Sequence, residues 1–533
     1  MVCGSPKTLM RATLAAALAT LVAAGCTHAG SRHTSGSRLV FSGLAGEPDS
    51  LNPMLSNEAD ELNFSHLYMS YLIENDDRGN AVAEIASQVP SLENGGISSD
   101  ERTVTYRLRR NVRWQDGQPL TARDVLFSYR AIADPRNNVP TRVGYEEVQR
   151  IHAPDPYTVV VRLRRRFSPF VQYFFGPQGV GAIMPAHLLS GIADLNHAAY
   201  NERPLGSGPF RVLSWRRGDS ITLVANPSYW RGKPRIDRLV YRIIADPNTR
   251  LEALRTGEAD AYFDVDPQLL PQVRSLSDVR VTLTPVNDLH VLRFNLRDPA
   301  LQDVNVRRAI AMAIDRQRLI AAATHGSGII VDADQPNNGW AYDAATPAIP
   351  YDPAGARRLL HGRSLDLTLA VAPQIINGSQ LVAAILQENL QRVGVRVTVK
   401  QYPSGMFYAT PALGGVLAGG RFQLAYDAWW VLGNDPDDSW NFGCAQLPPV
   451  GLNYSMWCDV RADAAMRDAM NTVGRYHRRA DYAVVQHAIA TQLPVFTLWQ
   501  VQIPNAFRSY VHGVAPSPAG STFWNAWSWT IGP

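Results

Sequence analysis

Segments with the period of a β-strand and segments with the period of an α-helix alternate along most of this chain. Alternating apolar and polar side chains, typical of a strand with one buried face, occupy residues 103–109, 158–163 and 211–225. Residues 304–314 and 380–393 instead place apolar side chains on one helical face. Gly394 then predicts a helix end, and residues 395–400 return to the strand period. This alternation predicts layered α/β lobes rather than an all-helical fold or a β-sandwich.

The length and charge of the chain limit its organisation and its partners. Its 533 residues exceed the roughly 250–300 that a single hydrophobic core serves, so two or three domains are expected. The net charge is +4, and Lys7 and Arg11 contribute two of these charges within a stretch that holds no Asp or Glu. The remainder is too weakly basic to predict a nucleic-acid partner.

The N-terminal residues carry the pattern of an exported protein. Lys7 and Arg11 precede an apolar stretch at 14–24, which is long enough for the core of a signal peptide and too short to span a bilayer. Ala23-Ala24-Gly25-Cys26 follows, and small residues before a cysteine resemble a bacterial lipobox. We therefore expect a lipoprotein signal peptide at 1–25 and acylation of Cys26, which would anchor the protein to the outer face of the cytoplasmic membrane. Ordinary secretory cleavage, with Cys26 incidental, is the alternative.

Composition predicts a flexible tether after Cys26, since residues 26–38 are rich in Ser, Gly, Thr and His. Two further cysteines, Cys444 and Cys458, lie far from the N-terminus. An exported compartment permits a disulfide, so we expect these two to pair, although two buried free thiols are the alternative. Closing a loop of this size would contribute about 3 kcal/mol.

Short motifs are spread from about residue 39 to the C-terminus. They are Glu47–Pro53, Thr105–Val125, Gly206–Phe210, Asn226–Trp230, Gly257–Asp260, Asn295 with Asp303–Ala309, and Ala313–Asp315. In this order they resemble the family 5 extracellular solute-binding proteins, which include the oligopeptide-, dipeptide- and nickel-binding proteins of ABC importers. Most of the motifs also have a structural explanation. Asp116-Gly117 suits a tight turn, and Thr121 is a predicted N-cap for the helix that follows.

The resemblance implies a periplasmic-binding-protein fold of two α/β lobes with a hinge and an inserted subdomain. The expected segments are 39–70, 200–290 and 500–533 for lobe I, 71–199 for the inserted subdomain, and 291–499 for lobe II. Ligand would be enclosed between the lobes, because closure expels water and strengthens each polar contact. The permease subunits of the importer would then recognise the closed form. A monomer is expected.

The resemblance also places ligand-binding residues in two segments. The first follows the opening motif and contains Asn57, Glu58 and Ala59. The second follows the strand 422–425 and contains Asp427, Trp429, Trp430, Leu432, Gly433, Asn434 and Asp435. Aromatic faces bury apolar groups and stack on cations, and carboxylates pair with ammonium groups. Since Trp429 and Trp430 alternate along a strand, one of them is expected in the core and the other at the ligand.

One position departs from the pattern of the peptide-binding relatives. They usually carry an aspartate three residues after the strand tryptophan, where it holds the α-ammonium of the ligand. Aligning Trp429 with that tryptophan puts Leu432 at this place. Asp435 or Asp427 would substitute, the backbone would hold the ligand, or the ligand would lack a free amine. Peptides are the favoured ligand, and nickel chelates, haem and modified peptides are the alternatives within the family.

The chain shows no motif of a common hydrolase. Gly-x-Ser-x-Gly, His-Glu-x-x-His and Cys-x-x-Cys are all absent from the sequence. Its 12 histidines show no close pairing with carboxylates that would predict a metal site. We therefore expect a binding protein without enzymatic activity, metal or cofactor. An exported hydrolase and an interaction lipoprotein that has lost transport are the competing hypotheses.

Overall fold

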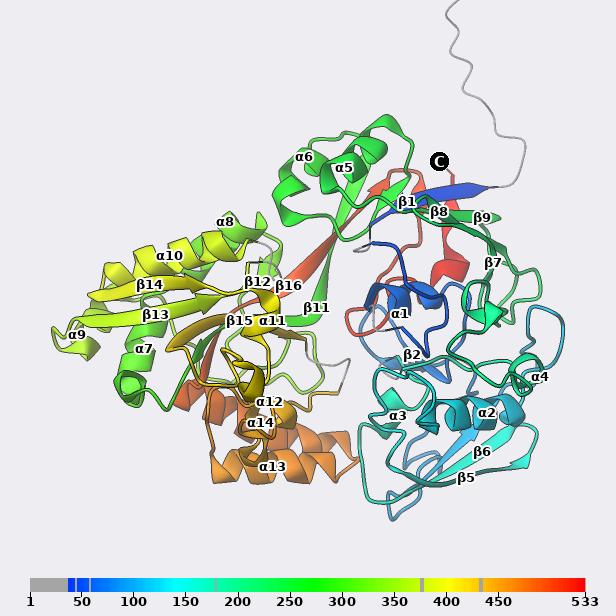
Figure 1. The fold of residues 1–533 in the computed structure, drawn as a ribbon, viewed down its shortest axis with the longest axis horizontal. Helices are drawn as coiled ribbons and strands as arrows, with labels where there is room; N and C mark the ends of the chain where they lie inside the picture. Colours follow the sequence, from blue (N-terminus) through cyan, green and yellow to red (C-terminus); the bar gives the residue numbers. More distant parts are fainter. Residues whose placement is uncertain are drawn as a thin grey trace, which may run out of the picture.

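A computed structural model describes residues 37–43, 46–56, 59–177, 180–373, 378–430 and 435–532, with backbone alone for 59–61 and 430. Within these ranges the chain is mixed α/β around a large central sheet, which confirms the predicted class (Figure 1). The strands of this sheet are β1 (Arg38–Ser42), β7 (Phe210–Arg216), β8 (Ser220–Ala225), β9 (Arg238–Arg242), β10 (Ala261–Tyr262), β11 (Val279–Phe294), β12 (Gly328–Ile329), β13 (Leu365–Val371), β14 (Val395–Gln401), β15 (Leu424–Trp430) and β16 (Val495–Arg508).

The order of the central sheet is β14-β13-β15-β11-β16-β10-β1-β9-β8-β7, and β12 pairs with β16. It extends through both halves of the molecule (Figure 1). Strands β13–β15 lie in one half, and β1 with β7–β10 lies in the other. The long antiparallel strands β11 and β16 pass from one half to the other. The predicted lobe boundaries, at 290/291 and 499/500, fall inside these two strands.

Helices lie in both halves, and smaller strand groups lie outside the central sheet (Figure 1). The helices are α1 (Ala59–Ser65), α2 (Ala122–Ala133), α3 (Phe170–Tyr173), α4 (Ala186–Leu189), α5 (Pro247–Thr256), α6 (Leu270–Arg274), α7 (Val304–Met312), α8 (Arg316–Thr324), α9 (Pro353–Leu360), α10 (Ser379–Gln391), α11 (Ser404–Phe407), α12 (Ser439–Phe442), α13 (Val460–Met470) and α14 (Arg475–Gln492). The further strands are β2 (Ile73–Asn75), β3 (Ala81–Ala83), β4 (Thr103–Arg107), β5 (Val148–Asp155), β6 (Thr158–Leu163), β17 (Val511–His512) and β18 (Thr530–Ile531). Across the described ranges, no helix is long and apolar enough to cross a membrane.

Local sequence signals explain several element boundaries. Gly117 has a positive φ of 92°, and its N–H donates to the Trp114 carbonyl at 2.8 Å, which confirms the predicted turn. Thr121 is the N-cap of α2, where its N–H donates to the Asp124 carboxylate at 2.8 Å. Residues 211–225 form two strands of a hairpin, because Gly218, with a φ of 70°, supplies a turn between β7 and β8.

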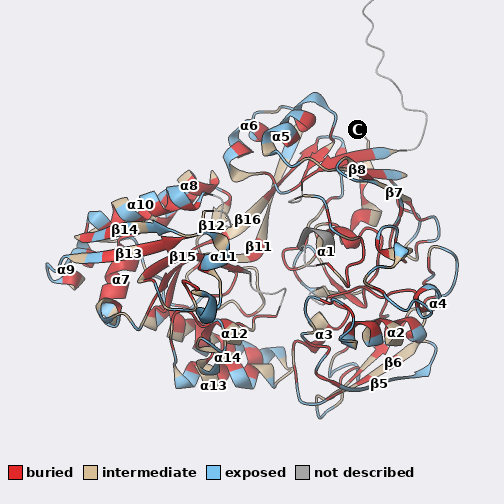
Figure 2. Ribbon diagram, viewed as in Figure 1, coloured by how far each residue is buried: buried red, intermediate tan, exposed pale blue. Residues whose placement is uncertain are grey.

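Each half has its own hydrophobic core (Figure 2). An aromatic cluster lies at the centre of one core. The centroid of the Phe41 ring lies within 5.6 Å of the ring centroids of Tyr241, Phe263 and Phe523. The other core packs apolar side chains of β11, β13 and α10, including Leu292, Leu369 and Leu386. Since both halves bury apolar surface independently, each has the main determinant of a separately stable unit.

The halves also touch away from the connecting strands. Ser168 N–H donates to the Met470 carbonyl at 3.0 Å, and the Ser168 hydroxyl donates to the Ala469 carbonyl at 2.8 Å. Val473 N–H donates to the Glu101 carboxylate at 3.2 Å. These contacts join the region around α3 and β4 to the end of α13.

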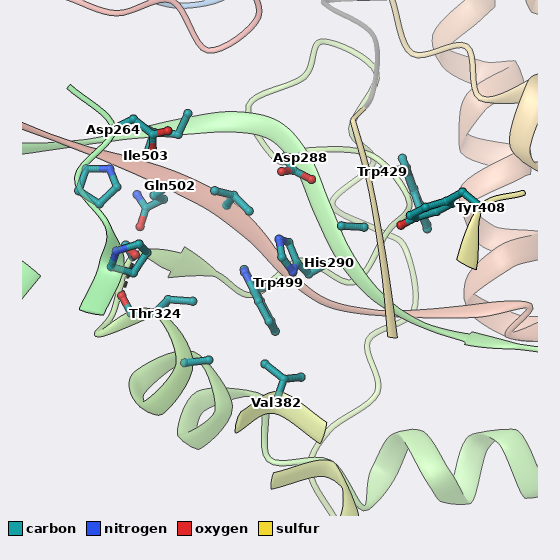
Figure 3. Close-up of a pocket in the computed structure, with 16 residues that line it drawn as sticks. Asp264, Asp288, His290, Thr324, Val382, Tyr408, Trp429, Trp499, Gln502 and Ile503 are labelled. Atoms are coloured by element: carbon teal, nitrogen blue, oxygen red, sulfur yellow. Dashed lines mark hydrogen bonds between the residues drawn. The ribbon is translucent and has the colours of Figure 1, made fainter. Parts of the chain in front are cut away.

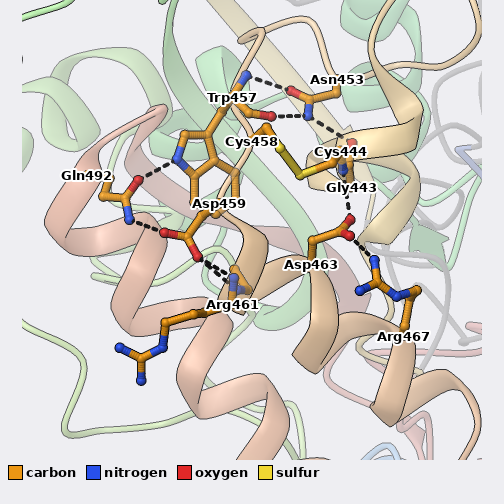
Figure 4. The surroundings of a disulfide bond; sticks show 11 residues. Gly443, Cys444, Asn453, Trp457, Cys458, Asp459, Arg461, Asp463, Arg467 and Gln492 are labelled. Atoms are coloured by element: carbon orange, nitrogen blue, oxygen red, sulfur yellow. Dashed lines mark hydrogen bonds and ion pairs between the residues drawn. A yellow bond between two sulfur atoms is a disulfide. The ribbon is translucent and has the colours of Figure 1, made fainter.

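The predicted disulfide between Cys444 and Cys458 is present, at the start of α13 (Figure 4). Asp463 of α13 accepts a hydrogen bond from the Cys444 N–H at 2.8 Å. Asp459 caps α13 by accepting from the N–H groups of Arg461 and Ala462 at 2.9 Å. The disulfide therefore lies within a segment that is also held by capping interactions.

Candidate ligand-binding site

The crossing of β11 and β16 contains an irregularity. Pro285 is opposite Gln502, but the next pair along the strands is Leu289 with Gln500. Residues 286–288 of β11 therefore stand against the single residue Val501 of β16, which is a bulge. A bulge bends its strand and re-aims side chains, and bulges are common beside functional sites. Asp288 lies in this bulge and pairs with Trp430 of β15 on the other side.

A cavity of about 330 Å³ lies beside the bulge (Figure 3). This volume is at the lower end of the range for small-molecule sites. The connecting strands supply much of the wall, including Asp288 and His290 of β11 and Trp499 of β16. Trp429 of β15 lines the cavity from one half, and Asp264, which follows β10, lines it from the other. The cavity is therefore bounded by both halves and by the strands that join them.

His290 forms an aromatic group with its neighbours in the cavity wall. Its ring stacks on Trp499 with centroids 4.4 Å apart, and the Tyr426 hydroxyl lies 2.5 Å from its Nδ1. Burial lowers the pKa of His290 to about 3. The imidazole is therefore neutral at physiological pH, and it contributes a flat ring rather than a positive charge.

Two carboxylates near the cavity have different surroundings. Asp427 is 2% exposed and forms an ion pair with Arg293 at 2.7 Å. The Tyr408 hydroxyl and the Ala428 N–H also donate to the Asp427 carboxylate, at 2.8 and 2.9 Å. Burial, and then the negative charge of Asp427, raise the pKa of Asp288 to about 7. The Asp427 carboxylate thus already has a cation and hydrogen-bond donors as partners inside the protein. Asp288 borders the cavity and has no cationic partner among the described residues.

The structure places the predicted Trp429 both in the core and at the cavity. Its side chain is 6% exposed, and its ring meets Phe442 edge-to-face with centroids 5.6 Å apart. The Arg293 guanidinium lies 5.4 Å from the same ring. Within the described part of the chain, the Trp429 Nε1 has no hydrogen-bond partner. The backbone of Trp430 belongs to β15, and its side chain is not among the described parts of the chain.

The other predicted site residues separate into two groups. Asp435 is buried and forms an ion pair with Arg478 at 2.7 Å, so its charge is compensated inside the protein. Ala59 opens α1, in the half opposite β15 (Figure 1). The remaining predicted positions lie outside the described residues: Cys26, Asn57, Glu58, Leu432, Gly433 and Asn434. In the described ranges, no cluster of three or more His, Cys, Asp or Glu side chains is arranged to hold a metal ion.

Reasoning from the sequence missed the residues of the connecting strands. Asp288, His290 and Trp499 all line the cavity. No local pattern distinguishes the first two, because β11 also contains the polar residues Arg280, Thr282, Thr284, Asn287 and Arg293. Their common position follows from pairing between strands about 210 residues apart, which no local pattern reports.

Two α/β halves joined by paired strands, with a cavity at the crossing, are the architecture of the periplasmic-binding-protein fold. Comparison with known proteins narrows this class. Residues 87–446 match the family described as bacterial extracellular solute-binding proteins, family 5 Middle. The chain belongs to this family, whose members are binding proteins.

Individual relatives agree over most of their length. Di/tripeptide-binding protein 1 of Pseudomonas aeruginosa (strain UCBPP-PA14) is 25% identical over 461 residues, covering 81% of this chain and 84% of the relative. Oligopeptide-binding protein AppA of Bacillus subtilis (strain 168) is 24% identical over 486 residues, covering 86% and 85%. The crystal structure of the ABC transporter substrate-binding protein CtaP from Listeria monocytogenes has a TM-score of 0.80 at 24% identity, covering 93% of this chain and 99% of CtaP.

Proposed function

We propose that this protein captures short peptides in the cavity between its halves and delivers them to the permease subunits of an ABC importer. The observation that carries the proposal is the position of the cavity, which both halves and the connecting strands line. The names of the di/tripeptide- and oligopeptide-binding relatives support a peptide as ligand. CtaP, named as a substrate-binding protein of an ABC transporter, supports the role in import.

The backbone of β15 supports a peptide that binds as an added strand. Strand β15 pairs with β13 only at Leu424 and Ala425. From Tyr426 to Trp430, in the part of the chain that is described, β15 has a strand partner on its β11 side alone. An extended peptide that binds a free strand edge gains affinity from main-chain hydrogen bonds and tolerates varied side chains. The predicted segments 57–59 and 429–434 remain part of the proposed site.

We assign structural roles to Asp427 and Asp435 within this proposal. Both are buried and both already have an arginine partner, Arg293 and Arg478 respectively. Removing such a partner from a buried charge is strongly unfavourable, so a ligand ammonium would have to displace a well-placed guanidinium. These two aspartates therefore shape the site rather than pair with the ligand.

The proposed mechanism is closure of two lobes around the peptide. Lobe I would comprise 39–70, 200–290 and 500–533, with 71–199 as an inserted subdomain, and lobe II would comprise 291–499. The separate cores and the two-strand connection support this division. A ligand that contacts both lobes stabilises the closed form by its differential affinity for the two states. The closed monomer would then be what the importer recognises.

The test of ligand identity is to denature the purified protein and identify the released small molecules by mass spectrometry. A mixture of short peptides is expected, and titration calorimetry with the recovered sequences should reproduce binding without cleavage of the peptide. A single non-peptide species would overturn the proposed ligand. Peptide hydrolysis during the titration would overturn the assignment as a binding protein.

Anchoring at Cys26 is a separate part of the proposal. It is supported by the sequence Ala23–Cys26 after an apolar stretch, and by membership of an extracellular family. Labelling of cells with radioactive palmitate should mark the wild-type protein in the membrane fraction. The variant C26A should lose the label, whereas C3A should keep it. Equal labelling of C26A and the wild type would exclude Cys26 as the acylated residue.

A further inference from the structure

The Asp288 carboxyl group at the cavity has no charged partner among the described residues. Among the described residues, no hydrogen bond or ion pair reaches its carboxylate, and it lies in the bulge where β11 and β16 lose register. Arg293 neutralises one of the two neighbouring carboxylates through its ion pair with Asp427. The Asp288 carboxyl group therefore has no cationic partner beside the cavity.

The rest of the cavity wall provides no compensating cation. Its sixteen lining residues include neither Lys nor Arg, and their carboxylates are Asp264 and Asp288. The only other ionisable side chains are the tyrosine Tyr408 and His290, which is neutral because burial lowers its pKa to about 3. An ionised carboxylate in partly desolvated surroundings is unfavourable unless it is paired. The wall is therefore complementary to a positively charged group.

Aromatic side chains strengthen the same preference. Trp429 and Trp499 both line the cavity, and indole faces attract ammonium and guanidinium groups. The two rings therefore favour the same kind of ligand as the unpaired Asp288 carboxyl group.

We propose that Asp288 binds the positively charged group of the ligand, so that the cavity selects a ligand with an alkylammonium or guanidinium group. This inference rests on the proposed capture of peptides. Two sources supply that chemistry, the α-ammonium of the peptide and a basic side chain. Asp288 acts from a connecting strand, a position separate from the β15 segment on which the predicted site was centred.

Calorimetry with matched tripeptides tests the proposal on the full exported protein. The ligands are Ala-Ala-Ala, its N-acetylated form, Ala-Lys-Ala and the norleucine analogue Ala-Nle-Ala. D288N should weaken binding of the tripeptide whose cationic group contacts Asp288 by ten- to a hundredfold, as loss of a hydrogen bond to a charged group predicts. If the α-ammonium is the source, acetylation should cause the same loss in the wild type and little further loss in D288N. If the lysine side chain is the source, replacing lysine by norleucine should weaken binding to the wild type by the same factor and cause little further loss in D288N.

Controls separate this inference from the proposed function. D366N removes an exposed carboxylate on β13, which pairs with Arg396, and should change affinity less than twofold. The thermal unfolding of D288N should match or exceed that of the wild type, since a poorly solvated charge is removed. Equal affinity of the wild type and D288N for a bound tripeptide would overturn the role of Asp288 and leave peptide capture intact. An anionic or uncharged ligand released from the denatured protein would overturn the selection of cations.

Discussion

Arg293 determines what Asp427 can do. Arg293 is 1% exposed, and its guanidinium donates to Asp427, to the Ser455 hydroxyl at 3.2 Å and to Asn441 Oδ1 at 3.3 Å. These contacts join β11 and β15 to α12 and to the loop that holds Ser455. The sequence indicated Asp427 as a candidate for the ligand, but its partner lies 134 residues away and becomes visible only when β11 and β15 pair.

The variant R293M should lower the free energy of unfolding by about 3–5 kcal/mol, because it leaves the Asp427 charge buried without a cationic partner. Urea denaturation followed by tryptophan fluorescence measures the loss. The double variant R293M/D427N removes both charges and should recover a large part of it. A loss below about 1 kcal/mol in R293M would show that the ion pair contributes little.

Glu84 makes stability depend on pH. Burial, and then the negative charge of Glu74, raise its pKa from 4.5 to about 8, although the Tyr71 N–H donates to its carboxylate at 2.8 Å. The folded protein therefore holds this proton more tightly than the unfolded chain does. The resulting stabilisation is complete below pH 4.5 and is lost as the pH rises toward 8.

E84Q keeps the acceptor for Tyr71 and removes the titration. It should raise stability at pH 8 by at least ~1 kcal/mol relative to the wild type, and should change it little at pH 4.5. Thermal unfolding across this range measures the difference. In E84Q the dependence of stability on pH should be weaker but still present, because burial also raises the pKa values of Asp288 and Asp437. As a control, E202Q replaces an exposed carboxylate and should show the same dependence of stability on pH as the wild type.

At the scale of elements, local patterns specified most of the helices and strands that they covered. β6 occupies the predicted range 158–163, and α7, α10 and β14 begin within one residue of their predicted starts. Turn chemistry decided where they end: the positive φ of Gly218 divides 211–225 into two strands, and the positive φ of Gly394 follows α10. These features depend on contacts within a few residues, and the sequence predicted the helix end at Gly394 but not the turn at Gly218, which divides the stretch expected as one strand.

The disulfide stabilises the segment between α12 and α13. Cys444 and Cys458 are 14 residues apart, and closing such a loop contributes about 3 kcal/mol, mainly by restricting the unfolded chain. The double variant C444S/C458S should lose about this much in urea denaturation. A reducing agent should destabilise the wild type by a similar amount and leave the variant unchanged. An effect of the reductant on the variant would mean that another thiol reaction contributes.

At the scale of the whole molecule, the two halves meet at the connecting strands and at a second contact around Ser168. The side chain of Tyr173 in α3 also lies close enough to the opposite half for charges there to affect its pKa. Burial raises its pKa, and the charges of Asp435 and Asp437 add to the shift. The acidic segment after β15 therefore faces α3 across the boundary, so movement of the halves would alter its surroundings.

Closure predicts a change of shape on binding. The radius of gyration from small-angle X-ray scattering should fall when a saturating peptide is added to the wild-type protein, because a ligand that contacts both halves favours the closed form. D288N at the same peptide concentration should show a smaller fall and should reach the wild-type value at higher concentration. An unchanged radius in the saturated wild type would indicate that the ligand binds without closure.

The sequence alone determined the α/β class, the family resemblance and the pairing of Cys444 with Cys458, because these depend on periodicity, on ordered short motifs and on a small number of cysteines. Only the tertiary structure decided which carboxylate is available to the cavity. Asp427 meets Arg293 and Asp288 remains unpaired because β11 pairs with β15 and, through a bulge, with β16. Such long-range register depends on packing of the whole sheet, which local patterns do not encode.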